Sequence, residues 1–310
     1  MYDLNFIEFI EKNNLDFLSG SAIKHILDSK KNDEADEIRS AISILEKKLV
    51  YLDKNRINSS VNNKYTENPK ILLKNIEFYF INLDKRTDRL SHVKKELSKI
   101  NLSAQKYKAI DTLDGCTINF GKDFTEGQKK CYLSHYSLIK NYNVNSDKIL
   151  GIFEDDVIFC QDFLERFNYV EKYFDLDWDV FYLSSFYHLN DDEKRWNKTG
   201  DYEKTNVKYI HRVYGSFCCH SYLINPRSIP KILKLLDEVI DQSRAIDHSF
   251  ILIQPKLNCF SFTPGMTNQI TNTSDTDGGL RDQTHFLNIL GQHYYINNLS
   301  EFDYDEYFKN

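Results

Sequence analysis

Apolar and polar positions alternate along the chain with two different spacings, and these spacings divide it into segments. Residues 1 to about 52 place apolar side chains such as Ile38 and Ala41 at helical intervals, which predicts amphipathic helices. Residues 53–70 turn polar, with Asn, Ser and Lys throughout, and predict a linker. We therefore expect an N-terminal helical segment (1–52), a polar linker (53–70) and one main domain (71–310).

Beyond residue 70 the spacing switches repeatedly between that of strands and that of helices. The aromatic and β-branched run "IEFYFINL" (76–83) predicts a strand, and Leu90, Val93 and Leu97 after it share one side of a predicted helix. The same succession follows in "KILGIF" and "DFLERFNYVEKYF", and later in "CCHSYLI" and "PRSIPKILKLLDEVI". Alternating strands and helices predict an α/β fold with a largely parallel sheet and helices on both faces.

Composition and charge narrow the classes of function. The 310 residues are 41% hydrophobic and 14% aromatic, which is enough for a substantial core. The net charge of -6 comes from 40 basic and 46 acidic residues spread along the chain, so no basic excess indicates a nucleic acid or an anionic membrane as partner.

The cysteines and the apolar runs lead to an expectation about location. The six cysteines show no C-x-x-C spacing, and we expect them to be reduced and mostly buried. The first residues lack the pattern of a secretory signal, and no apolar run approaches the roughly 20 residues that span a bilayer. We therefore expect a soluble, cytoplasmic protein without a transmembrane segment.

An acidic triplet follows one of the predicted strands. In "GIFEDDVIF" (151–159), Glu154, Asp155 and Asp156 lie where the strand ends. Ligands of such sheets bind beyond the carboxyl ends of the strands, and hard divalent cations prefer oxygen ligands. The triplet therefore indicates a metal site that also holds substrate phosphates. The alternative is an exposed acidic loop that caps a helix beginning near Asp162.

Two arginines follow the first strand of the predicted domain. Arg86 and Arg89 lie three residues apart in "FINLDKRTDRL", close together if a helix begins there. Each guanidinium group can donate two parallel hydrogen bonds, which suits a diphosphate. The alternative is a charged first turn of a helix, with Asp84 or Thr87 as its N-cap.

Four motifs in order resemble those of glycosyltransferase family 25, which contains lipopolysaccharide and collagen galactosyltransferase-like enzymes. They are "FYFINLDKRTDRL", "KYKAIDTLDG", "KKCYLSHYSLIK" and "ILGIFEDDVIF". The resemblance covers roughly residues 75–275. It implies a GT-A type nucleotide-sugar fold, a UDP-sugar donor, a divalent metal (usually Mn²⁺, otherwise Mg²⁺) and inversion at the anomeric carbon.

The resemblance also assigns residues to the site. It implies Asp156 as the principal metal ligand, with Glu154 or Asp155 contacting metal or ribose. His135 has the alternative of a buried histidine that is hydrogen-bonded to backbone. The segment around Asp111 departs from the family pattern. The residues assigned to nucleotide or substrate binding are Asn82, Leu83, Arg86, Arg89, Asp111, Ser134, His135, Glu154, Asp155, Gln269 and Ser274.

Inversion requires a general base within reach of the acceptor hydroxyl. Asp247, in "RAIDHSFILIQ", resembles the family's aspartate at this position, and the alternative is a simple N-cap of the helix that follows. His248 is a weaker alternative base. The segment "TPGMTNQITNTSDT" resembles the family's tail, which implies that Gln269, Ser274 and Asp275 close over the donor, although Asp275-Thr276 departs from the usual ending. The alternative is a polar surface loop.

These observations lead to one favoured function and two alternatives. We expect a metal-dependent inverting transferase that moves a hexose, galactose or glucose, from a UDP-sugar to a hydroxyl acceptor on a glycan or protein. The alternatives are a nucleotidyltransferase, for which a Gly-rich phosphate loop is lacking, and a non-catalytic module that binds sugar nucleotide or glycan. The N-terminal helices are candidates for pairing two copies of the chain.

Overall fold

The computed structural model describes most of the expected main domain. The described residues are 69–142, 148–185, 202–217, 219–270, 272–273, 275–276 and 280–281. All of them belong to the second of two compact units into which the chain divides, Glu67–Asn310. The predicted N-terminal helices and most of the predicted linker lie outside the described residues, so the predicted domain boundaries stay predictions.

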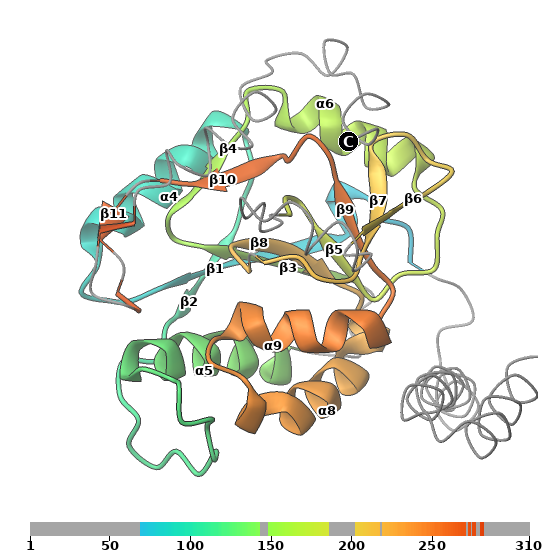
Figure 1. The fold of residues 1–310 in the computed structure, drawn as a ribbon. Coiled ribbons are helices and arrows are strands. Elements are labelled where there is room, and N and C mark those ends of the chain that lie inside the picture. Colours follow the sequence, from blue (N-terminus) through green and yellow to red (C-terminus); the bar gives the residue numbers. More distant parts are fainter. Residues whose placement is uncertain are drawn as a thin grey trace, which may run out of the picture. The chain divides into compact units, whose positions relative to one another are not determined.

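An eight-stranded sheet runs through this unit in the order β2-β1-β3-β8-β5-β9-β7-β6 (Figure 1). Two two-stranded sheets accompany it, one of β4 and β10 and one of β11 and β12. The strands are β1 (Ile76–Asn82), β2 (Gln105–Lys108), β3 (Ile149–Glu154), β4 (Val157–Phe159), β5 (Val180–Tyr182), β6 (Tyr202–Lys204), β7 (Ile210–Val213), β8 (Ser221–Ile224), β9 (Cys259–Phe262), β10 (Thr267–Gln269), β11 (Asn272–Thr273) and β12 (Leu280–Arg281).

The large sheet is mixed, whereas the sequence predicts a largely parallel one. β1 is parallel to both β2 and β3, and β5 is parallel to β9. β8 is antiparallel to β3 and β5, and β7 is antiparallel to β9 and β6. All four residues of β8 are buried. A short, fully buried run has no pattern of exposed and buried positions that distinguishes a parallel from an antiparallel strand, so the sequence did not indicate the direction of β8.

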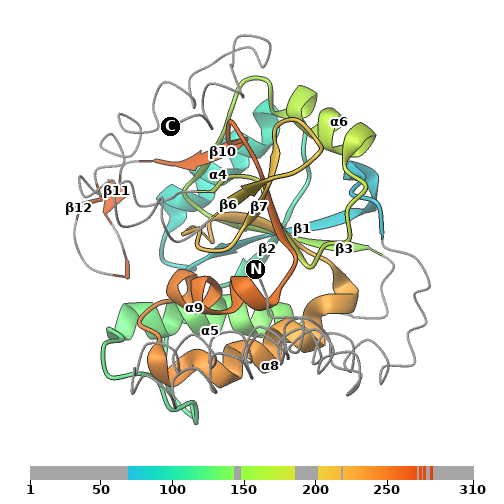
Figure 2. The same ribbon diagram turned by 45° about the vertical axis from the view of Figure 1, so that its right-hand side comes forward.

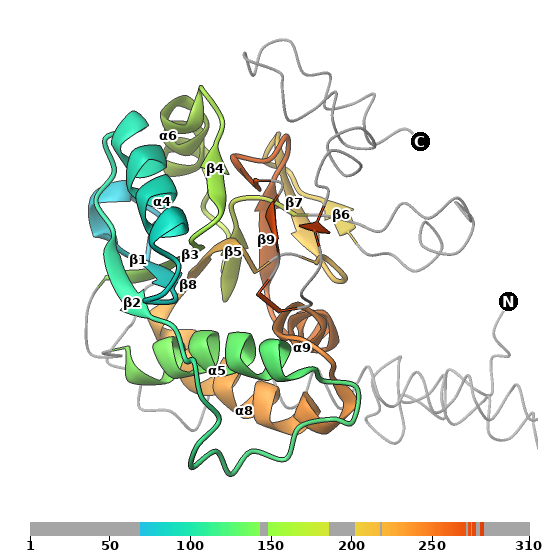
Figure 3. The same ribbon diagram turned by 90° about the vertical axis from the view of Figure 1, so that its left-hand side faces the viewer.

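Helices cover both faces of the sheet, as predicted (Figures 1 and 2). On one face α4 and α6 share a hydrophobic cluster with Phe78 and Phe80 of β1. On the other face α5, α8 and α9 share a cluster with Ile81 of β1 and Ile152 of β3. Figure 3 shows these two groups of helices on separate sides of the strands. The helices are α4 (Thr87–Lys99), α5 (Glu126–Asn141), α6 (Phe163–Tyr173), α8 (Ile229–Val239) and α9 (Ile246–Ile253), with 3-10 turns at Leu73–Asn75, Pro226–Ser228, Ile240–Gln242 and Gln254–Lys256.

Among the described residues, no helix combines the length and the apolar character that crossing a bilayer requires.

Local sequence explains why α5 begins where it does. Thr125 is its N-cap and accepts a hydrogen bond from the backbone N–H of Gln128, whose side chain accepts one from the backbone N–H of Thr125. This reciprocal pair satisfies two N–H groups that a helix start otherwise leaves unpaired. The start of α5 is thereby fixed. The helix then carries Ser134 and His135 along the face of the sheet that α8 and α9 also cover.

The pairing of β1 with β3 depends on Gly151. A side-chain Cβ at this position would lie 2.3 Å from a ring carbon of Phe78 and 2.9 Å from Ile76 Cγ2. Glycine therefore lets the Phe78 ring stack on Phe153, with centroids 5.1 Å apart. In the resulting register Ile81 lies opposite Glu154, so the ends of β1 and β3 meet at the acidic triplet.

Candidate functional site

The candidate site lies where β1 and β3 end side by side. β3 ends at Glu154, and a two-residue turn at Asp155 and Asp156 leads into β4. We call these three residues the acidic motif. β10 pairs with β4 in antiparallel fashion, with Gln269 opposite Val157, so a distant segment of the chain also reaches the turn. The strand ends thus deliver the side chains, as the sequence predicts for the carboxyl edge of such a sheet.

Side chains from both neighbouring strands hold the acidic motif by hydrogen bonds. Asn82 Nδ2 donates to Asp155 Oδ2 at 2.7 Å. Gln269 Nε2 donates to Glu154 Oε2 at 2.9 Å and to Asp156 Oδ1 at 3.1 Å. One amide group therefore ties the first and last carboxylates of the motif together. The sequence places Gln269 in a tail that closes over the donor; the structure places it against the acidic motif, and closure over the donor stays a prediction.

Arg89, on the first turns of α4, supplies positive charge to the motif. Its Nη1 lies 2.9 Å from Asp155 Oδ1 and 3.2 Å from Asp156 Oδ2. Asp155 and Asp156 are only 7% and 9% exposed, so the acids turn inward toward the arginine. The alternative of an exposed acidic loop is therefore wrong. Asp162 is the N-cap residue of α6 but makes no side-chain capping hydrogen bond.

Negative charge exceeds positive charge in this cluster, and the pKa values respond to that excess. Burial, and then the neighbouring Glu154 charge, raise the pKa of Asp156 to about 7, although Arg89 opposes the shift. Burial also raises the pKa of Asp155, against the hydrogen bond from Asn82 and the charge of Arg89. Burial lowers the pKa of Arg89, but the Asp156 and Asp155 charges outweigh it and leave that pKa raised. A further cation would lower the free energy of the ionised motif.

The donor atoms of the motif fit a hard divalent cation. Its carboxylates supply oxygen ligands. Asn82 Oδ1, beside Asp155, is buried and finds no hydrogen-bond partner among the described residues. Carboxylate and amide oxygens are the ligands that Mg²⁺ and Mn²⁺ prefer. The acidic motif and Asn82 are therefore the residues that could hold such an ion.

Arg86 lies at the edge of the same site and connects it to the tail. Its Nε and Nη2 donate to the two carboxylate oxygens of Asp88 at 3.0 and 2.9 Å, and its Nη1 pairs with Asp275. Asn82 Nδ2 also donates to the backbone oxygen of Arg86 at 3.2 Å. Arg86 is the N-cap residue of α4 without a side-chain cap, so neither Asp84 nor Thr87 takes the N-cap position considered from sequence.

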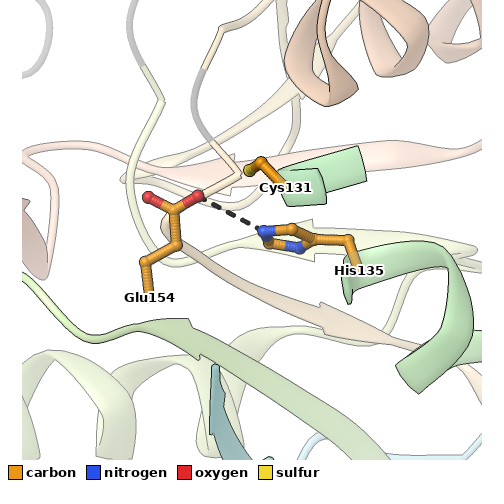
Figure 4. Close-up of side chains that lie close together, drawn as sticks. All are labelled: Cys131, His135 and Glu154. Carbon is orange, nitrogen blue, oxygen red and sulfur yellow. Dashed lines mark hydrogen bonds and ion pairs between the residues drawn. The ribbon is translucent and has the colours of Figure 1, made fainter. Parts of the chain in front are cut away.

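His135, on α5, reaches the acidic motif from the face of the sheet opposite to α4. Its Nε2 lies 3.3 Å from Glu154 Oε1, and its Nδ1 lies 2.9 Å from the hydroxyl of Tyr222. Both ring nitrogens thus face side chains, which excludes the alternative of a histidine held by backbone. Figure 4 shows Cys131, one helical turn before His135, turned toward the same Glu154. Sequence reasoning missed Cys131 and Tyr222, although the four-residue spacing of Cys131 and His135 on a helix was visible.

The remaining predicted site residues have their observed contacts elsewhere in the described part of the chain, or lie outside the described residues. Ser134 Oγ accepts from Ile110 N at 2.8 Å and donates to the Lys130 backbone oxygen at 2.7 Å, a structural role. Leu83 packs on the cluster below the sheet. Asp111 is exposed and pairs with Lys85.

Two further predictions concern residues toward the end of the chain. Asp247 lies in the first turn of α9, partly buried, while Ala245 is the N-cap residue, so capping is not the role of Asp247. Ser274 lies outside the described residues. The structure leaves the predicted roles of both residues as predictions.

Known proteins resemble this chain over the region that builds the site. A model of glycosyltransferase family 25 (LPS biosynthesis protein) matches residues 75–250. Procollagen galactosyltransferase 1-A of Xenopus laevis is 26% identical over 220 residues, which cover 61% of this chain and 35% of that protein. Inactive glycosyltransferase 25 family member 3 of Mus musculus is 30% identical over 132 residues, which cover 34% of this chain and 21% of that protein.

The chain spans about a third of the length of the procollagen galactosyltransferases that it matches. Among solved structures, mouse xyloside xylosyltransferase 1 matches 73% of this chain and 85% of its own, with 10% identity and a TM-score of 0.33, a likeness too low to carry an argument. The family match covers more than half of the chain and includes β1, α4, α5, β3 and the acidic motif. The chain belongs to glycosyltransferase family 25.

Proposed function

We propose that this chain is a metal-dependent, inverting glycosyltransferase of the GT-A type, which transfers a hexose from a UDP-sugar to a hydroxyl group on a glycan or protein. The observation that carries the proposal is the gathering of the acidic motif with Arg89 and Gln269 at the carboxyl ends of β1 and β3. Membership of the family supports a sugar transfer. The name of the Xenopus relative favours galactose over glucose as the hexose.

The acidic motif is the proposed holder of Mn²⁺ or Mg²⁺, with Asp156 as the principal ligand. When bound, such a cation stabilises the negative charge that develops on the departing diphosphate. The chain's own contribution is to fix the ligands before the substrate arrives. Asn82 and Arg89 orient Asp155, and Gln269 orients Glu154 and Asp156, so that little reorganisation is needed.

Arg86 and Arg89 are the proposed partners of the donor phosphates. The Arg89 guanidinium contacts the acidic motif, and the Arg86 charge is close enough to oppose protonation of Arg89. Arg86 has its Nη1 directed to Asp275 of the tail. If a donor phosphate replaced the Asp275 carboxylate at Arg86, donor binding would release this contact between Arg86 and the tail.

Asp247 is the proposed general base. A base must accept the proton of the acceptor hydroxyl on the face of the sugar opposite the leaving group. Asp247 lies in the first turn of α9, where the helix dipole stabilises the ionised carboxylate. Loss of this carboxylate should lower turnover and leave donor binding intact, which separates its role from that of Asp156.

A turnover assay on the full chain tests the proposal. A panel of UDP-sugars is incubated with and without Mn²⁺, and free UDP is measured for the wild type, Asp156→Asn and Asp247→Asn. Asp177→Asn is the matched control, because Asp177 also pairs with an arginine, Arg227. Asp177 lies just before the start of β5, at the end of the strands opposite the acidic motif. The wild type and the control should release UDP from one sugar with Mn²⁺, and Asp156→Asn should not.

Other outcomes have distinct meanings. UDP release that does not depend on the metal, or that persists in a folded Asp156→Asn, would contradict the metal assignment. Metal-dependent UDP binding without release, with hydroxyl acceptors present, would favour a binding module, in keeping with the relatives that are named inactive. Release of pyrophosphate from a nucleoside triphosphate would favour the nucleotidyltransferase alternative.

A further inference from the structure

A second cluster of ligating side chains lies on the α5 side of the acidic motif. Cys131 Sγ, His135 Nε2 and a carboxylate oxygen of Glu154 all lie within 4.8 Å of one another (Figure 4). Cys131 and His135 are one turn apart on α5 and therefore share a face of that helix, which is directed at the end of β3. The cluster thus combines sulfur, nitrogen and oxygen donors, whereas the acidic motif offers oxygen alone.

The orientation of the histidine ring is set independently of the other two ligands. The Tyr222 hydroxyl lies 2.9 Å from His135 Nδ1, and the two rings stack with centroids 5.9 Å apart and planes 18° from parallel. Tyr222 and His135 are both buried. When Nδ1–H donates to the hydroxyl, Nε2 presents its lone pair toward Glu154 and Cys131. A hydrogen-bonded partner on the far nitrogen is the usual support of a histidine that binds a metal.

We propose that Cys131, His135 and Glu154 form a binding site for a thiolate-accepting divalent cation, with Zn²⁺ as the best match. Tetrahedral Zn²⁺ with sulfur, nitrogen and oxygen ligands requires about 3.4–3.6 Å between ligand atoms. Nε2 and Glu154 Oε1 are already 3.3 Å apart, so only modest side-chain movement closes the site. Three protein ligands leave a fourth position open to water or substrate.

Charge balance supports this assignment. On binding, the Cys131 thiol loses its proton to solvent and coordinates as thiolate, while Glu154 coordinates as carboxylate and His135 as neutral imidazole. Two negative ligands then neutralise the two charges of the ion, and the site carries no net charge. Affinity should therefore rise with pH as the thiol proton is lost more easily.

The site is distinct from the acidic motif but shares one residue with it. Glu154 Oε2 accepts from Gln269, and Glu154 Oε1 faces His135. Occupation of the Cys131 site would engage Glu154 from the α5 side. Zn²⁺ is thus expected to compete with any ion that draws on Glu154 through the acidic motif.

Cobalt is the probe for the test, because a thiolate bound to Co²⁺ gives a charge-transfer absorption band that oxygen ligands do not give. Co²⁺ is titrated into the full chain, and then Zn²⁺ is added to displace it. The wild type should show the band with one equivalent of Co²⁺ and lose it on addition of Zn²⁺. Asp156→Asn should keep the band, so this result does not depend on the proposed transferase activity.

Three variants locate the site. Cys131→Ser should abolish the band. Cys116→Ser, the matched control in a loop, should keep it, since both cysteines are of intermediate exposure. Tyr222→Phe keeps all three ligands but removes the partner of Nδ1, and should weaken the affinity for Zn²⁺ by about 10–100-fold.

The proposal would be overturned by either of two results. The first is a wild-type chain that gives no thiolate band at any Co²⁺ concentration, in which case His135 Nε2–H simply donates to Glu154. The second is a band that Cys131→Ser retains while its Trp178 fluorescence matches that of the wild type, because the thiolate would then come from another cysteine. Unaltered Zn²⁺ affinity in folded Tyr222→Phe would refute the supporting role of Tyr222.

Discussion

Arg89 should be essential for stability because it compensates two buried acids. Its Nη1 contacts Asp155 at 2.9 Å and Asp156 at 3.2 Å, and all three side chains are at most 12% exposed. In Arg89→Met the aliphatic bulk is kept and the charge is lost, so the carboxylates stay buried without their cation. Breaking a buried pair in this way costs about 3–5 kcal/mol of the free energy of unfolding.

Urea unfolding measures this loss directly. Trp178 is buried and donates a hydrogen bond to the backbone oxygen of Pro69, so its fluorescence reports unfolding of this unit. Arg227→Met is the matched control: Arg227 pairs with Asp177, which is 66% exposed, and such pairs contribute about 0–1 kcal/mol. Arg89→Met should therefore lose several times more stability than Arg227→Met.

A double variant tests whether the loss comes from the acids. Arg89→Met combined with Asp155→Asn should lose less than the sum of the two single changes, by about 0.5–3 kcal/mol, because the asparagine leaves less charge uncompensated. Two results would refute the reasoning. One is a loss in Arg89→Met no larger than in Arg227→Met, and the other is strict additivity in the double variant.

Three further predictions follow from the packing and the charges. Gly151→Ala should lose about 1–3 kcal/mol in urea unfolding, because the new methyl group meets the Phe78 ring; a variant as stable as wild type would contradict this. In Gly127→Ala the new Cβ would lie 2.6 Å from the backbone oxygens of residues 275 and 276 and would displace this part of the tail, so the KM for the donor should rise. The intrinsic stability of the helix should rise by up to about 1 kcal/mol. An unchanged KM would contradict this prediction. Burial lowers the pKa of His211 from 6.5 to about 3, so the unfolded chain binds the proton first and the free energy of unfolding falls as the pH drops below about 6.5. His211→Gln should reduce the slope of the free energy of unfolding against pH by up to about 1.4 kcal/mol per pH unit. An unchanged slope between pH 4 and 6 would contradict the assignment.

The sequence predicts the elements of this fold better than their directions. The run 76–83 and the helix after it correspond to β1 and α4, and helices do cover both faces of the sheet. The antiparallel course of β8 and the pairing of β6 with β7 were not predicted. Hydrophobic spacing reports which residues are buried, whereas strand direction depends on pairings between distant segments.

The candidate site shows the same division. Because polar residues directly after strands gather at one edge of a sheet, sequence alone indicated the acidic motif and Arg89. The family resemblance was needed for Gln269, whose contact with the acids depends on the pairing of β10 with β4. Cys131 lies inside the motif "KKCYLSHYSLIK", but neither it nor Tyr222 was assigned to the site from sequence. Their proximity to His135 depends on how α5 packs beneath β8, which periodicity does not specify.

The acidic motif is proposed to bind a divalent cation together with UDP, and calorimetric titration of UDP measures this coupling. UDP is titrated into the full chain with and without Mn²⁺, for the wild type, Asp156→Asn and the control Asp177→Asn. Mn²⁺ should strengthen UDP binding in the wild type and in the control but not in Asp156→Asn. Equal UDP affinity with and without Mn²⁺ in the wild type, or an undiminished Mn²⁺ effect in Asp156→Asn, would contradict it.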